Sequence, residues 1–195
     1  MSNLRDVPSV MPSVSGALAT TPQIIEDSRA NRFIGRFLAA AHARNAQRIA
    51  LLPWDDEESA RAVGSILAAT VSLQLGQTCA LVVAEGIRVH RQSMGAFDVL
   101  TVPDVEVPAQ AAVAEAIAEA SRAYPVQFFV GPAVSEWADA APQKALMASR
   151  CHAAVIVAPE EGLPRHAMKV IDSLRKAANI QIFGVLPYAR GGHRG

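Results

Sequence analysis

Four consecutive acidic residues, Asp55, Asp56, Glu57 and Glu58, form the densest group of titratable side chains in the sequence. Carboxylates can bind a hard cation such as Mg²⁺, or act as a general acid and base when their environments differ. Acidic residues at the start of a helix also oppose the positive end of the helix macrodipole. Helix stabilisation is the simplest interpretation of the four residues. A cation site is the second interpretation, and paired acid–base catalysis is the third.

The segments around these acids predict a strand–helix–strand unit. An apolar run at Ile49–Pro53 comes before the acids, an apolar-periodic segment at Ala60–Leu75 comes after them, and a second apolar run follows at Cys79–Val83. Short loops between such segments favour a parallel βαβ arrangement. Phosphate-binding loops at this point of a βαβ unit are rich in glycine and contain a lysine. This loop has neither, so we predict the frame of a phosphate site without its chemistry.

The remaining segments extend this pattern into a single domain over residues 22–190, with a leading helix at 22–43. We expect a flexible segment at 1–21 and a frayed tail at 191–195. Further strands are predicted at 96–102, 126–130, 153–158 and 180–186, and further helices at 109–123, 136–150 and 164–178. Strands that alternate with helices predict an α/β fold: a doubly wound, mostly parallel sheet of six or more strands.

Ligands of open α/β sheets bind at the carboxyl ends of the strands. Arg61 follows the acidic loop, Glu85 follows the second strand and Gly131 follows the strand at 126–130. A phosphate here would meet the four acids, and one like-charge contact at ~4 Å costs about 4 kcal/mol at an effective dielectric constant of about 20. A magnesium–nucleotide enzyme needs a carboxylate after one of these strands, which only Glu85 supplies. We find no catalytic group and no metal-ligand spacing among the histidines, and we predict no cofactor.

Composition limits the partners and the compartment. The 195 residues have a formal net charge of zero and no local cluster of Lys and Arg, which does not favour nucleic acid. No apolar run approaches the roughly 20 residues that span a bilayer, so we expect no direct membrane insertion. The two cysteines, Cys79 and Cys151, adjoin apolar runs, as buried reduced thiols do. We expect a cytoplasmic protein, which a partner could recruit to the inner membrane.

The leading helix contains an E-x-x-R-x-x-R pattern, formed by Glu26, Arg29 and Arg32. This pattern, the spacing from the acidic loop to Gly76 and the closing strand–helix–strand segment resemble the kinase domain of bacterial tyrosine autokinases of capsular and exopolysaccharide biosynthesis. These kinases belong to the deviant-Walker P-loop group, with the septum-site and plasmid-partition ATPases. The resemblance covers residues 22–190 and implies a P-loop NTPase-like three-layer sandwich. It also implies that the three charged residues lie at the subunit interface of a homo-oligomer.

The nucleotide-binding residues of that family are replaced here. The resemblance places Arg61 near the P-loop lysine, and Val83 and Glu85 near the aspartates of the Walker A′ motif. Gly131 falls at the aspartate of the Walker B motif, and Tyr188 is the only tyrosine near the end of the chain. The family's kinase activity therefore cannot be transferred to this sequence.

Three hypotheses follow. The first is a pseudoenzyme that acts as a scaffold or regulator in exopolysaccharide biosynthesis and export, pairing with itself or with an export or polymerase membrane subunit. The second is an enzyme or sensor with a ligand site rebuilt around Arg61, Glu85 and the acidic loop. The third is a positioning regulator similar to the septum-site and partition ATPases.

Overall fold

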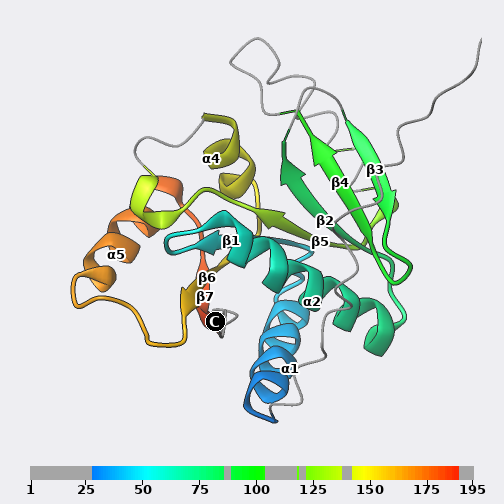
Figure 1. Cartoon of the computed structure of the whole chain (residues 1–195), viewed down its shortest axis with the longest axis horizontal. Coiled ribbons are helices and arrows are strands. Elements are labelled where there is room, and N and C mark those ends of the chain that lie inside the picture. The colour runs from blue at the N-terminus through cyan, green and yellow to red at the C-terminus, as the bar shows by residue number, and fades with distance from the viewer. Residues whose placement is uncertain (1–27, 86–88, 104–117, 119–121, 138–141, 189–195) are drawn as a thin grey trace, which may run out of the picture.

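The computed structural model describes residues 28–85, 89–103, 118, 122–137 and 142–188 (Figure 1). The predicted segments at 1–21 and 191–195, and most of the predicted helix at 109–123, lie outside these residues. None of the described helices is long and apolar enough to cross a lipid bilayer.

The described strands form one seven-stranded sheet with the order β3-β4-β2-β5-β1-β6-β7. All neighbouring pairs are parallel except β3 with β4. The parallel strands therefore share one edge where they end, called here the carboxyl edge, and one where they begin, called the amino edge. The strands are β1 (Arg48–Pro53), β2 (Cys79–Ala84), β3 (His90–Ser93), β4 (Asp98–Val102), β5 (Val126–Val130), β6 (Ala153–Pro159) and β7 (Ile182–Tyr188).

Helices cover both faces of the sheet (Figure 1). On one face, α1 and α2 pack through residues such as Phe37 and Leu67 onto Leu51 and Phe128. On the other face, α4 and α5 contribute Met147 and Ile171 to a second core. The described helices are α1 (Ser28–Ala43), α2 (Glu57–Leu75), α4 (Pro142–Ser149), α5 (Ala167–Ala178) and the short 3₁₀ helix η2 (Val134–Glu136).

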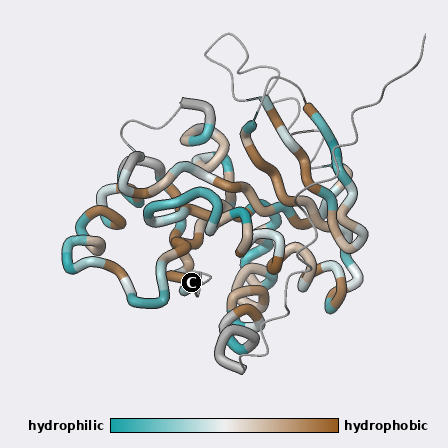
Figure 2. The backbone as a smooth tube through the Cα atoms, in the orientation of Figure 1, coloured by the Kyte–Doolittle hydropathy of each residue, from teal (hydrophilic) through white to brown (hydrophobic). Residues whose placement is uncertain are grey.

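Much of the central strands is apolar along the chain, as the brown parts of the tube in Figure 2 show. β2 is buried along its whole length, and so is β6 except for Pro159 at its end. Strands of a parallel sheet that helices cover on both sides need such continuous apolar runs. Both cysteines are buried, as expected, and burial raises the pKa of the Cys79 thiol to about 12.

The predicted α/β class with a mostly parallel sheet of six or more strands is confirmed. One strand was not predicted: β3 consists of four polar, exposed residues and adds an antiparallel edge. Its sequence lacks the apolar pattern of the other strands because neither of its faces is buried. The helix predicted at 136–150 differs at its start, where Glu136 ends the 3₁₀ helix η2; residues 138–141 lie outside the described residues, and α4 is described from Pro142 to Ser149.

Candidate functional site

The acidic loop lies at the carboxyl edge and is anchored to the sheet by Trp54. The backbone N–H of Trp54 donates to the carbonyl of Val157 at 2.7 Å, and its carbonyl accepts from the N–H of Ser135 at 3.3 Å. The indole is buried in the core that α4 and α5 cover. These two hydrogen bonds hold the beginning of the acidic loop between β6 and the segment after β5.

Asp56 caps helix α2. It has an extended backbone, and its carboxylate accepts a hydrogen bond from the backbone N–H of Glu58 at 2.9 Å. A phosphate bound at the start of this helix would use the same type of N–H donor. The helix begins at Glu57, three residues earlier than predicted, because the acids form its cap and first turn. Of the three interpretations of the acidic loop, this geometry favours helix stabilisation.

Two ion pairs cross the carboxyl edge. Arg61 of α2 contacts Glu85, the residue after β2, with 2.5 Å between nitrogen and oxygen. Lys144 of α4 donates to both carboxylate oxygens of Glu57, at 2.7 and 2.9 Å. The Lys144 side chain is only 17% exposed, whereas Arg61 and Glu85 are each about half exposed. The Lys144 pair is therefore the better shielded of the two.

Gly131 directly follows β5 and has no room for a side chain. Its backbone N–H donates to the carbonyl of Leu51 at 2.9 Å. A Cβ atom added at Gly131 would lie 2.5 Å from Cδ2 of Leu52, which is fully buried. A side chain at this position therefore requires the buried side chain of Leu52 to shift.

The carboxyl edge carries more negative than positive charge among the described residues. Seven carboxylates follow the ends of β1, β2 and β6, whereas four basic side chains lie near them. The acids are Asp55, Asp56, Glu57, Glu58, Glu85, Glu160 and Glu161, and the bases are Arg61, Lys144, Arg165 and Lys169. Within the described part of the chain, no three acidic, histidine or cysteine side chains converge as metal ligands would. The field at this edge attracts cations and repels phosphates.

The structure brings together most of the residues that the sequence singled out at this edge. The acidic loop, Arg61 and Glu85 are neighbours, and Gly131 lies at the end of the adjacent strand β5. Lys144 was missed because 87 residues separate it from Glu57 and no local pattern marks it. Of the predicted interface residues, Arg29 and Arg32 lie in α1 and Arg32 is exposed, while Glu26 is outside the described residues.

The amino edge holds a second group of polar residues. Asp98 accepts a hydrogen bond from the hydroxyl of Tyr124 at 2.5 Å and forms an ion pair with Arg91 at 2.6 Å. Burial alone would raise the pKa of Asp98, but hydrogen bonds from Tyr124 and Ser93 and the charge of Arg91 outweigh it, and the pKa is lowered. Burial and the nearby Asp98 carboxylate raise the pKa of Tyr124 to about 12. This cluster joins β3 and β4 to the start of β5.

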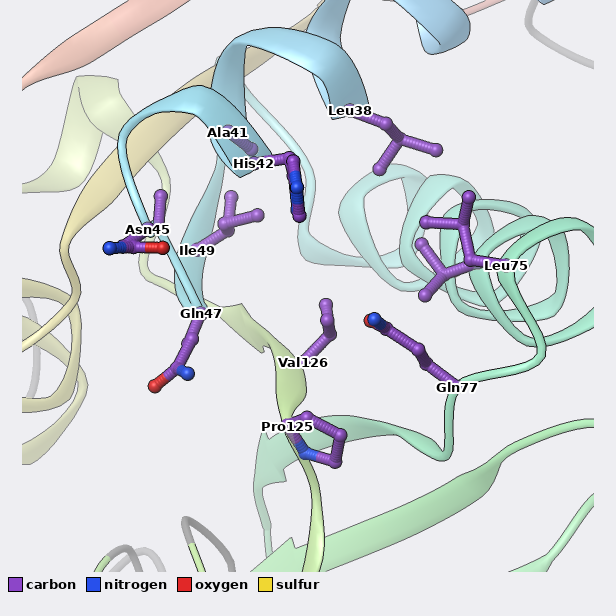
Figure 3. Close-up of a pocket in the computed structure, with 12 residues that line it drawn as sticks. Leu38, Ala41, His42, Asn45, Gln47, Ile49, Leu75, Gln77, Pro125 and Val126 are labelled. Atoms are coloured by element: carbon purple, nitrogen blue, oxygen red, sulfur yellow. The ribbon is translucent and has the colours of Figure 1, made fainter.

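An open cavity of about 170 Å³ also lies at the amino edge, between the ends of α1 and α2 (Figure 3). Leu38, Ile49, Leu75 and Val126 supply apolar walls. The polar residues of its lining are uncharged amides and an imidazole: His42, Asn45, Gln47 and Gln77. The cavity is therefore at the opposite end of the sheet from the acidic loop.

Solved structures with a similar fold include bacterial tyrosine kinase domains. The kinase domain of Escherichia coli tyrosine kinase ETK is 15% identical with a TM-score of 0.58, covering 86% of this chain and 76% of that one. The VpsO kinase domain is 13% identical with a TM-score of 0.56, covering 84% and 97%. The BceF tyrosine kinase domain is 11% identical with a TM-score of 0.60, covering 82% and 75%. The chain has the fold of these kinase domains.

At these identities the likeness establishes the fold and not the activity. No protein-family model matches the sequence, and no curated protein sequence matches it significantly. The predicted resemblance to the tyrosine autokinase domain is thus confirmed at the level of the fold.

Proposed function

We propose that this chain is a pseudoenzyme that keeps the fold of the polysaccharide tyrosine kinases as a scaffold. It would act as a regulator in exopolysaccharide biosynthesis and export, of capsule or holdfast type, by binding other proteins. Its partners would be a second copy of itself and a membrane subunit of the export or polymerase machinery, which would recruit it from the cytoplasm. The kinase-like fold over more than four-fifths of the chain supports the relationship.

One observation supports the pseudoenzyme proposal: charged and polar groups at the carboxyl edge are paired with one another. The Asp56 carboxylate accepts the helix N–H that a phosphate would use, Glu57 holds Lys144, and Glu85 holds Arg61. ATP would have to displace these carboxylates and bind in a field that repels it. In the ATP sites of related folds, by contrast, backbone amides and a lysine are free to bind the phosphate groups.

Isothermal titration calorimetry with ATP and Mg²⁺ tests this proposal. We expect no binding heat at nucleotide concentrations up to the millimolar range. A matched titration with ATP alone shows whether Mg²⁺ by itself attracts the nucleotide to the carboxylates. Micromolar binding in either titration, or transfer of phosphate to Tyr188 or another tyrosine, would contradict the pseudoenzyme assignment.

A second candidate function is a ligand-binding site rebuilt around Arg61 and Glu85. It is favoured by the contact between these two side chains, which approach from α2 and the end of β2 and stay about half exposed. A ligand with one anionic and one cationic group could replace the pair by contacting both residues. Arg61→Ala and Glu85→Ala would each abolish binding of such a ligand while leaving the thermal unfolding midpoint nearly unchanged, since exposed ion pairs contribute little stability. An unaltered affinity in both variants would exclude this site.

A further inference from the structure

We propose that the amino edge of the sheet docks onto an anionic lipid surface. The inference does not depend on the proposed function, since it uses only residues at the opposite end of the molecule from the acidic loop. It concerns surface contact with lipid headgroups and not insertion of a helix across the bilayer.

Basic side chains are distributed along the amino edge. Five exposed ones lie in the segments that lead into strands β1, β5, β6 and β7: Arg44, Arg122, Arg150, Arg175 and Lys176. Among the described residues near this edge, Asp98 is buried and paired with Arg91, and Asp172 lies one helical turn before Arg175 and Lys176 in α5. The chain is neutral as a whole, but its described residues divide into an acidic carboxyl edge and a basic amino edge.

Large apolar side chains are exposed at the same edge. Leu73 and Leu75 in the last turn of α2 are 72% and 52% exposed, and Met94 at the turn between β3 and β4 is 40% exposed. Leu75 also lines the open cavity, together with residues on either side of Arg44 (Figure 3).

A basic surface with protruding leucines fits an anionic membrane better than it fits nucleic acid. Headgroup phosphates attract the arginines and lysine, while the apolar side chains enter the boundary between headgroups and acyl chains. A nucleic acid would also be attracted by the charge, but it offers no apolar phase for Leu73 and Leu75. The acidic carboxyl edge would then face away from the membrane, because the negative lipid surface repels it.

Vesicle sedimentation with the full chain tests this inference. We expect the protein to sediment with vesicles of phosphatidylcholine and one-third phosphatidylglycerol, not with pure phosphatidylcholine, and to be released by salt. Each basic residue lost from such a surface lowers the partition coefficient about five-fold. The pair Arg44→Glu and Arg122→Glu should therefore weaken binding by at least about 25-fold. The pair Leu73→Ser and Leu75→Ser should weaken it without changing the salt dependence.

Matched controls separate this surface from a general charge effect. The pair Arg165→Glu and Lys169→Glu removes the same charge from the start of α5, near the carboxyl edge, and should leave vesicle binding close to that of the wild type. Circular dichroism confirms that each variant is folded. The inference would be overturned if the protein bound neutral and anionic vesicles equally well, or bound neither. It would also be overturned if the control pair weakened vesicle binding as much as the pair Arg44→Glu and Arg122→Glu. The inference would also be overturned if a DNA duplex, at a concentration below that of the anionic lipid, displaced the protein from the vesicles. That result would indicate a nucleic-acid surface.

Discussion

At Gly131, directly after β5, the neighbouring side chain of Leu52 leaves little space for any side chain larger than hydrogen. A methyl group there would meet the buried Leu52, only 2.5 Å away. Overpacking of this kind costs about 1–3 kcal/mol, because the neighbouring side chain must leave its preferred rotamer. We expect Gly131→Ala to lower the free energy of unfolding in urea by that amount, and Gly131→Asp to lower it further because it also buries a carboxylate.

Gly35 provides the matched control for this prediction. It lies in helix α1, is exposed, and has no atom within 4 Å of the position of an added Cβ. Gly35→Ala should raise the free energy of unfolding by up to about 1 kcal/mol, as alanine is the better helix former. Equal effects of the two substitutions would show that the packing after β5 is looser than the structure indicates.

His152 makes the stability of the chain depend on pH. Its Nδ1 atom accepts a hydrogen bond from the backbone N–H of Gln47 at 3.1 Å, which needs an unprotonated nitrogen. Burial lowers the pKa of His152, and the nearby Arg48 cation lowers it further. The unfolded chain therefore binds the proton more readily, so this contribution to stability is present above about pH 6.5 and is lost on acidification.

Urea unfolding between pH 5 and pH 8 checks this dependence. The wild type should lose stability as the pH falls through the histidine range, and His152→Gln should lose less over the same interval. The other histidines are the same in both proteins, so the difference between the two curves isolates His152. Parallel curves would contradict the role of its hydrogen bond.

At the scale of an element, helix α2 depends on its cap. The Asp56 carboxylate accepts the N–H of Glu58, and replacing such a cap by alanine costs about 0.5–2 kcal/mol. We expect Asp56→Ala to lower the free energy of unfolding by this amount, measured by denaturant titration. Asp56→Asn should cost much less, because asparagine caps helices about as well as aspartate does. If Asp56→Asn also lowered the free energy of unfolding strongly, the stabilisation would come from the charge of Asp56 and not from its hydrogen bond.

Elements with a strong periodic pattern could be predicted from the sequence. The apolar run at β5 was located to the residue, and α2 ends at Leu75 as predicted because Gly76 adopts the left-handed conformation that terminates it. β3 could not be predicted, since its four residues bury neither face and pair only through their backbone. The contact of Lys144 with Glu57 was also out of reach, because it depends on how α4 docks beside α2. Patterns of burial are local, whereas ion pairs between distant elements follow from the completed fold.

At the scale of the whole molecule, the predicted assembly interface remains a prediction. Arg29 and Arg32 are three residues apart in α1, a spacing that puts two positions on the same face of a helix. Light scattering of the variant Arg29→Glu, Arg32→Glu should give a smaller mass than the wild type if the helix contacts a neighbouring copy. Lys169→Glu, on the exposed side of α5, serves as the control and should leave the mass unchanged. The same mass in all three proteins would remove α1 from the interface.

The two tryptophans give the molecule a reporter on one side only. Trp54 lies at the start of the acidic loop, and Trp137 follows η2 beside it, packed against the same core. The amino edge, with its leucines and arginines, has no tryptophan among the two in the sequence. Intrinsic fluorescence should therefore change when a ligand enters the carboxyl edge and stay constant when vesicles bind at the other end. The intrinsic emission spectrum therefore indicates whether a ligand has bound at the carboxyl edge or at the amino edge.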